Sequence, residues 1–286
     1  MDTLKLLRIP FSYFLMPVFF FALSQAMPFD TFKAFTSFIV LHLFIYPASN
    51  GYNSYMDKDE TSIGGLESPP KPTKNLFYAS LLFDTIGLLL SLAIGIKFFC
   101  MILIYTIASR AYSFKGIRLK KYAIIGFLTV VIFQGSFTFW MIYSSISVSS
   151  IALQSEMIYI LFGCFFLIGG VYPITQIYQH EADKANADLT LSYKLGIKGT
   201  FLFSASMFML ATVFLYLYFS SIQKLSQFYL MQFFLFPVIY HFIGWFIKVL
   251  KIPDEANYRN TMKMNFIAAT CMNLFFITIL ILNLYK

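Results

Sequence analysis

The chain has 286 residues, of which 59% are hydrophobic and only 12% are charged. A soluble domain of this length needs far more charged surface, so the composition excludes an ordinary water-soluble protein and predicts an integral membrane protein. The net charge of +8 does not indicate nucleic-acid binding, because the basic residues follow the membrane topology derived below.

Nine mostly apolar segments of about 20 residues follow one another along the chain, each long enough to cross a bilayer. We therefore predict an all-α bundle of nine transmembrane helices that forms a single domain over residues 1–286. Only Lys97 separates the third segment from the fourth. The predicted spans are Phe11–Met27, Ala34–Tyr52, Leu76–Ile96, Phe98–Ser113, Tyr122–Ile146, Glu156–Tyr178, Thr200–Ser221, Phe228–Leu250 and Met262–Tyr285.

Lysine and arginine residues divide unevenly between the two sides that nine spans define. With a cytoplasmic N-terminus, only Lys33, Lys97, Lys224 and Lys286 lie on the far side, and the other 17 of the 21 are cytoplasmic. Cytoplasmic loops carry an excess of Lys and Arg, so we expect a multi-pass protein whose N-terminus and active site face the cytoplasm. In a bacterium this would be the inner membrane. The positive charge also suits an anionic substrate or membrane lipids.

Acidic residues gather in two polar stretches, 53–75 and 179–199, which hold seven of the 13 acids. Nine spans place both stretches on the cytoplasmic side. A membrane protein that collects its acids on one face is expected to form a site there. The two stretches follow helices that are four spans apart, which fits a duplicated four-helix unit.

The first polar stretch begins at the end of the second span. If that helix continues, Asn50, Asn53 and Asp57 fall at i, i+3 and i+7 and share one face. Amide and carboxylate oxygens are the ligands that Mg²⁺ prefers, often together with substrate phosphates. The alternative interpretation is a solvated helix end with no ligand.

The second polar stretch repeats this spacing with Gln176, Gln179 and Asp183 at the end of the sixth span. The same pattern on a second helix, ending on the same side, favours a shared Mg²⁺ site. Pro173 is expected to kink this helix and free a backbone carbonyl. His180 is interpreted as a hydrogen-bonded interfacial residue rather than a proton donor or acceptor.

Basic residues that suit a diphosphate lie between these stretches. Lys71 stands in the stiff segment Pro69-Pro70-Lys71-Pro72, and Arg118 and Lys120 follow the fourth span. Arginine binds phosphate through two parallel hydrogen bonds, and lysine acts as a point charge. Lys115 and Lys121 are interpreted as anchors at the membrane surface, an alternative that also remains open for Arg118.

At these residues the chain resembles the UbiA superfamily of intramembrane aromatic prenyltransferases, over nearly its whole length. The family's first motif, Asn-Asp-x-x-Asp-x-x-x-Asp followed by Pro-x-Arg-Pro, is similar to Asn53-Ser54-x-x-Asp57-x-x-x-Thr61 and Pro69-Pro70-Lys71-Pro72. Its second motif, Asp-x-Glu-Gly-Asp and a later Thr-Leu, is similar to Gln179-His180-Glu181-Ala182-Asp183 and Thr190-Leu191. Its Tyr-Ser…Arg-Leu-Lys-Arg loop is similar to Tyr112-Ser113…Arg118-Leu119-Lys120-Lys121. The chain departs from the family at Thr61 and Gln179, where acids are usual, and Asp59 or Glu60 could supply the missing carboxylate.

The resemblance implies a Mg²⁺-dependent prenyltransferase, a transferase of alkyl groups other than methyl. A prenyl diphosphate would be ionised and its prenyl group passed to a lipid-soluble acceptor, expected to be an aromatic compound or quinone precursor. The implied metal ligands are Asn53, Asp57, Gln179 and Asp183. The implied catalytic residues are Asp57, Asp183, Lys71, Arg118 and Tyr112, and the implied substrate-binding residues are Asn50, Asn53, Lys71, Arg118, Lys120 and Tyr178. The aromatic faces expected to stabilise the allylic cation are those of Tyr52, Tyr112, Tyr172 and Tyr178.

Two other functions remain open. A terpene cyclase would use the same site but cyclise the prenyl cation without an acceptor. A transporter would need polar residues that thread the membrane, and Gln134, Asn265 and Asn273 lie in spans without a charged path between the faces. The intramembrane Asp84 is expected to pair with a polar group such as His42 or His241.

Overall fold

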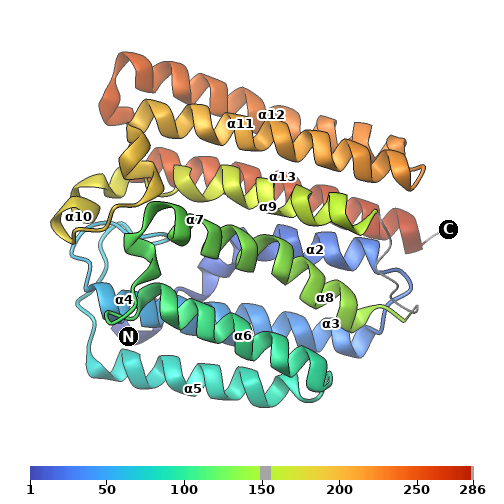
Figure 1. The fold of residues 1–286 in the computed structure, drawn as a ribbon, viewed down its shortest axis with the longest axis horizontal. Coiled ribbons are helices and arrows are strands. Elements are labelled where there is room, and N and C mark those ends of the chain that lie inside the picture. The colour runs from blue at the N-terminus through green and yellow to red at the C-terminus, as the bar shows by residue number, and fades with distance from the viewer. Residues whose placement is uncertain (149–155, 285–286) are drawn as a thin grey trace.

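The computed structural model describes residues 1–148 and 156–284, which form a bundle of helices lying side by side (Figure 1). The described ranges contain no strand, only isolated bridges between loops, so the all-α prediction is confirmed. Tyr285, the predicted end of the last span, and Lys286 lie outside these ranges. The elements are α1 (Asp2–Leu7), η1 (Ile9–Leu15), α2 (Met16–Gln25), α3 (Thr31–Phe38), η2 (Ile39–Ile45), α4 (Tyr46–Asp57), α5 (Lys74–Ser91), α6 (Ile96–Ser113), η3 (Leu119–Lys121), α7 (Ala123–Val131), η4 (Ile132–Phe137), α8 (Thr138–Ile146), α9 (Met157–Ile174), η5 (Ile177–Gln179), α10 (His180–Ala185), α11 (Leu191–Ser221), α12 (Leu225–Lys251), η6 (Pro253–Glu255) and α13 (Tyr258–Leu284).

Eight helical stretches of the described chain are long and apolar enough to cross a membrane. They correspond to every predicted span except the third. That span is α5, in which Lys74, Asn75 and Asp84 interrupt the apolar run, so the count of nine stays a prediction. Large apolar side chains such as Phe233 and Tyr240 are exposed on the outer surface of the bundle, as expected where lipid is the solvent.

The second span is one continuous helix built from α3, the π-helical segment η2 and α4. Pro47 has no N–H to donate to the carbonyl four residues earlier, and the wider π turn just before it absorbs this break. The helix then runs to Asp57 and ends at Lys58, which is in the left-handed region with φ 54°. Asn50, Asn53 and Asp57 therefore lie on one helical face, as their spacing predicts.

The sixth span differs from its prediction. α9 ends one residue beyond Pro173, a turn follows, and the chain continues as η5 and α10. Gln176, Gln179 and Asp183 therefore lie on a turn, a 3₁₀ helix and a short α-helix, so the single helical face expected for them is wrong. After Pro173 the hydrogen bonds tighten to a three-residue spacing: the Gln176 N–H donates to the Pro173 carbonyl at 3.1 Å, and the Gln179 N–H donates to the Gln176 carbonyl at 2.9 Å.

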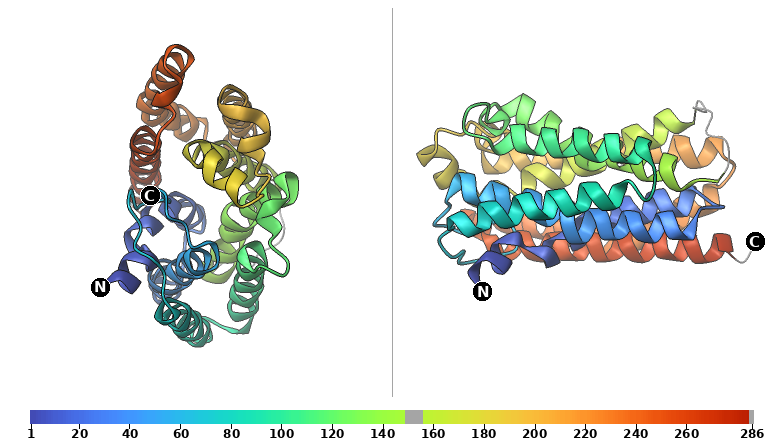
Figure 2. Two further views of the ribbon diagram at one scale, coloured as in Figure 1. Left: turned by 90° about the vertical axis from the view of Figure 1, so that its left-hand side faces the viewer. Right: turned by 90° about the horizontal axis from the view of Figure 1, so that it is seen from below.

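Glycine allows the site-bearing helix α4 to approach its neighbours closely. A Cβ added at Gly51 would lie 2.6 Å from the Ser80 hydroxyl of α5 and 2.8 Å from Leu7 of α1. The C-terminal end of α4, the short helix α10 and the N-terminus all lie at the left-hand end of Figure 1. Viewed from that end in Figure 2, the helices are arranged around a common axis. The two polar stretches therefore meet at one end of the bundle.

Candidate active site

A cavity of about 600 Å³ lies within the bundle. Its mouth lies at the end where α4 and α10 meet, and polar and charged side chains line it there. Further inside, the lining is mostly apolar. The residues that line the mouth include Arg8, Asn50, Asn53, Asp57, Asp59, Lys120, Gln176, Tyr178, Gln179, Asp183 and Asp188.

The apolar part of the cavity is deep and has a closed end. Its lining runs from Tyr172 to Cys164 on α9 and from Met264 to Phe276 on α13, which corresponds to about 12 and about 18 Å at the rise of an α-helix. At the bottom, Phe276 stacks on Phe21 with ring centroids 4.3 Å apart. Fully buried core residues fill the bundle beyond this pair: Phe139, Ile142, Phe219, Phe275 and Ile279. Among the described residues, the cavity therefore does not continue to the far end.

The cavity also reaches the lateral surface of the bundle. Met209 of α11 and Ile239 and Ile243 of α12 line it, yet each side chain is also exposed on the outside. A lipid-soluble molecule in the cavity would thus meet the hydrocarbon of the bilayer between these two helices.

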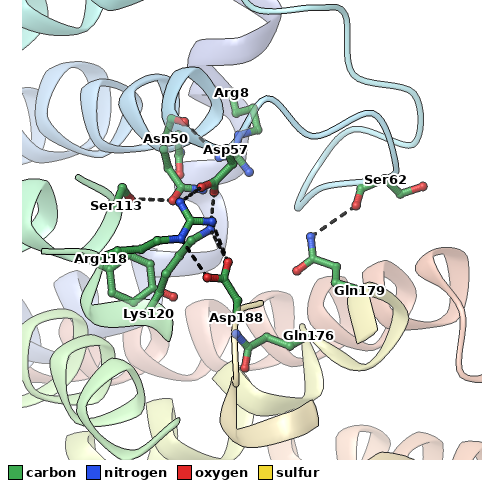
Figure 3. Close-up of polar contacts among 12 residues, drawn as sticks. Arg8, Asn50, Asp57, Ser62, Ser113, Arg118, Lys120, Gln176, Gln179 and Asp188 are labelled. Atoms are coloured by element: carbon green, nitrogen blue, oxygen red, sulfur yellow. Dashed lines mark hydrogen bonds and ion pairs between the residues drawn. The ribbon is translucent and has the colours of Figure 1, made fainter. Parts of the chain in front are cut away.

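Four charged side chains form a compact cluster at the mouth, which we call the charge quartet: Asp57, Arg118, Lys120 and Asp188 (Figure 3). The Arg118 guanidinium donates to both carboxylate oxygens of Asp188 at 2.8 Å and to Asp57 Oδ1 at 3.2 Å. Lys120 Nζ lies 2.5 Å from Asp57 Oδ2 and 3.4 Å from Asp188 Oδ2. Burial alone would lower the pKa of Arg118, but its hydrogen bonds to Asp188 and both carboxylate charges raise it.

Arg8 is a buried cation at the mouth that sequence reasoning treated only as a topology signal. It is 8% exposed and donates to the carbonyls of Gly64 at 2.9 Å and Asn50 at 3.2 Å. Its Nε is buried without a partner among the described residues. Position before an apolar span was the only available signal, because its two contacts come from residues 42 and 56 positions away.

The predicted metal ligands all line the mouth, although they make different contacts. Asn53 Oδ1 accepts a hydrogen bond from Ser113 at 2.6 Å, and Asp183 Oδ2 accepts one from Thr190 at 2.8 Å. Gln179 donates to the Ser62 carbonyl at 3.3 Å, a contact seen in Figure 3. Helix α4 and the segment η5–α10 thus present their oxygen-bearing side chains to one space.

Of the two alternatives for the missing acid, Asp59 lines the cavity whereas Glu60 lies outside it. Burial, followed by the nearby charge of Asp57, raises the pKa of Asp59 to about 6. Glu60 pairs instead with Lys71 at 3.6 Å, and the Lys71 side chain is 90% exposed. The structure therefore does not bring Lys71 to the cavity.

Three of the four tyrosines expected near a cation line the cavity: Tyr112, Tyr172 and Tyr178. The hydroxyls of Tyr112 and Tyr172 hydrogen-bond to each other, and Gln176 Nε2 donates to Tyr172 at 3.0 Å. Tyr52 lies elsewhere, with its ring 4.0 Å from the Arg110 guanidinium.

The mouth offers the oxygen ligands that a hard cation such as Mg²⁺ prefers. Besides the carboxylates and amides above, Gln176 Oε1 is buried there without a hydrogen-bond partner among the described residues. In the same part of the chain, no three acidic, histidine or cysteine side chains lie close enough to form a complete metal cage. This donor set fits Mg²⁺, which commonly uses one or two carboxylates and completes its shell with phosphate oxygens and water.

Behind the cavity wall, Asp84 of α5 forms a buried ion pair with Arg110 of α6, and not with either histidine considered from the sequence. Arg110 also stacks on Tyr52 of α4 and donates to the Ala48 carbonyl at 3.4 Å. The pair thus joins the three helices α4, α5 and α6 within the membrane-spanning region. Its role is one of structure rather than direct contact with the cavity.

Comparisons with known proteins agree with this architecture. The sequence model of the UbiA prenyltransferase family matches residues 14–267. A UbiA homologue from Archaeoglobus fulgidus, solved with GPP and Mg²⁺ and also with DMAPP and Mg²⁺, superposes with a TM-score of 0.72 at 16% identity, covering 98% of this chain and 99% of that one. A structure described as digeranylgeranylglyceryl phosphate synthase gives a TM-score of 0.61 at 19% identity over 98% and 96% of the two chains. At these identities the likeness establishes the fold. No curated protein sequence matches the chain.

Proposed function

Because the chain belongs to the UbiA prenyltransferase family, we propose that it ionises a prenyl diphosphate and transfers the prenyl group to a lipid-soluble acceptor, an aromatic compound or quinone precursor. One observation carries this proposal: the same cavity joins a charged, oxygen-rich mouth to a deep apolar interior. The diphosphate matches the mouth, and the prenyl chain matches the interior. The ligands named for the Archaeoglobus fulgidus homologue, GPP, DMAPP and Mg²⁺, are of this kind.

Cationic side chains at the mouth bind the diphosphate in this proposal. Arg8 and Lys120 line the cavity, and Arg118 lies directly behind them in the charge quartet. Mg²⁺ would be held by Asn53, Asp57, Gln179 and Asp183, and when bound it neutralises charge on the departing diphosphate. Asp59 and Gln176 Oε1 stand in the same space and offset the acids absent at Thr61 and Gln179.

Aromatic and apolar side chains handle the prenyl cation. Tyr112, Tyr172 and Tyr178 line the upper cavity, where their rings can stabilise positive charge without reacting with it. The hydrogen bond between the hydroxyls of Tyr112 and Tyr172 fixes the positions of both rings. The apolar lining below excludes water, which would otherwise capture the cation as an alcohol.

The membrane orientation is part of the proposal. Lys33, Lys97 and Lys224 stand at the start of α3, α6 and α12, at the end of the bundle opposite the cavity mouth. Most other basic residues lie toward the mouth, so we place the mouth and the N-terminus on the cytoplasmic side.

The test is turnover of geranyl diphosphate with Mg²⁺ by the purified chain, with and without candidate acceptors. Asp57→Ala and Asp183→Ala are each expected to lower kcat/KM by about a hundredfold or more, because each removes an anionic ligand. Asp254→Ala, a change at an exposed acid that does not line the cavity, is the matched control. Folded variants at positions 57 and 183 that keep full turnover would refute the site. Hydrocarbon or alcohol products formed without any acceptor would favour a cyclase instead.

A further inference from the structure

Asp188 belongs to neither of the acidic motifs, yet the fold holds it firmly in the mouth. Its N–H donates to the Asp183 carbonyl at 2.9 Å, and the following Leu189 N–H donates to the Lys121 carbonyl at 3.2 Å. These contacts join the segment before α11 to the segment that carries Arg118 and Lys120. The Asp188 carboxylate is only 2% exposed and has both of these cations as partners.

The charge quartet is electrically balanced, with two carboxylates and two cations. Both Asp57 oxygens are engaged, Oδ1 by Arg118 and Oδ2 by Lys120. A divalent cation that binds Asp57 must therefore displace at least one of them or accept its repulsion. A diphosphate can draw the same cations away from Asp57, because it offers several anionic oxygens at once.

The contacts of Asp188 indicate which of the two cations can leave Asp57. Arg118 makes two parallel hydrogen bonds to Asp188, whereas Lys120 is 3.4 Å from it and has a flexible stem. If both cations left, Asp188 would remain buried and unpaired, which is strongly unfavourable. Arg118 is thus expected to stay on Asp188 and turn its third nitrogen toward the diphosphate, while Lys120 swings from Asp57 to the substrate.

We propose that Asp188 is a positioning residue that holds Arg118 in the site and shares Lys120 with Asp57, so that Asp57 becomes free for a divalent cation as the diphosphate arrives. This inference rests on the proposed function and adds a role for a residue outside its motifs. Loss of this acid is therefore expected to raise the affinity of the mouth for diphosphate in the absence of metal.

The experiment is calorimetric titration of the purified full-length protein with inorganic pyrophosphate in EDTA. Asp188→Asn leaves the quartet with one excess positive charge, so metal-free pyrophosphate is expected to bind about three- to tenfold more tightly than to the wild type. With geranyl diphosphate and Mg²⁺, KM should fall because the mouth has gained positive charge, and kcat should fall because Arg118 loses its bidentate support. A purely structural defect would instead weaken binding. Asp188→Glu, which keeps the charge, should restore the wild-type affinity, and Asp254→Asn controls for net charge.

Lys120→Met tests the same arrangement from the other side and does not depend on how well Asp188→Asn folds. It frees Asp57 Oδ2, so Mn²⁺ alone is expected to bind about three- to tenfold more tightly, while pyrophosphate binds more weakly. Two results would overturn this inference but leave the proposed function standing. One is an Asp188→Asn variant that binds metal-free pyrophosphate no better than the wild type. The other is a Lys120→Met variant with no gain in Mn²⁺ affinity. A wild-type protein that binds no pyrophosphate with or without Mg²⁺ overturns the proposed function and this inference with it.

Discussion

The Asp84–Arg110 pair allows a quantitative test of how the site-bearing helices are held together. The side chains of Arg110 and Asp84 are 17% and 10% exposed, so both charges are largely removed from solvent. Asp84→Asn leaves the Arg110 guanidinium buried without a counter-charge, and we expect this to lower the free energy of unfolding by about 3–5 kcal/mol. Arg110→Met leaves the carboxylate unpaired and also removes the stacking on Tyr52, which is worth about 1–2 kcal/mol. The double variant removes both charges, so its decrease in unfolding free energy should be smaller than the sum of the two single decreases.

The measurement is a double-mutant cycle by SDS-induced unfolding in mixed micelles, followed by circular dichroism. We expect a coupling energy of about 3 kcal/mol for the buried pair. The exposed pair Arg259–Glu67, with side chains 81% and 52% exposed, is the matched control and should give less than about 1 kcal/mol. A coupling energy for Asp84 and Arg110 as small as that of the surface pair would refute the reasoning.

Three further changes test other parts of the structure. Arg8→Ala should lower kcat/KM by about tenfold or more, because it removes a buried cation at the mouth. The Lys71 side chain is 90% exposed, so Lys71→Ala should change kcat/KM by less than about twofold. Equal losses in the two variants would contradict this assignment. Phe276→Ala removes a ring from the closed end of the cavity. The preferred donor among geranyl, farnesyl and geranylgeranyl diphosphates should then become longer by about one isoprene unit. Unchanged kcat/KM ratios would show that the prenyl chain of the substrate does not reach this end. Gly51→Ala places a Cβ 2.6 Å from the Ser80 hydroxyl and should destabilise the protein by about 1–3 kcal/mol in the same unfolding assay, with partial recovery in Gly51→Ala/Ser80→Ala.

The helical architecture could be predicted from the sequence because membrane spans depend on local composition. Runs of apolar residues of bilayer length identified the helices, and all but α5 also meet that criterion in the structure. The shared helical face of Asn50, Asn53 and Asp57 was also predictable, because the spacing of these residues matches the period of a helix. The predicted order of spans placed both acidic stretches at one end of the bundle, and the structure brings them to one cavity.

Contacts between distant segments were beyond this reasoning. Arg8 becomes part of the mouth through carbonyls 42 and 56 residues away, and Asp188 meets Arg118 across 70 residues. The sequence suggested a histidine as the partner of Asp84, whereas the structure pairs it with Arg110 near the end of α6. Pro173 signalled a kink, but the sequence could not show that the helix would break into three segments there. Each of these outcomes depends on packing rather than on local periodicity.

The stacked phenylalanines at the bottom of the cavity have a consequence for the cell as well as for the substrate. In the described part of the chain, the aqueous mouth communicates with the hydrocarbon through the side of the bundle but ends against Phe21 and Phe276. Protons and metal ions that enter the cavity mouth from one side of the membrane therefore meet apolar side chains before they can reach the other side. An enzyme with this architecture can act on an amphipathic substrate within the membrane without opening a path for ions across it.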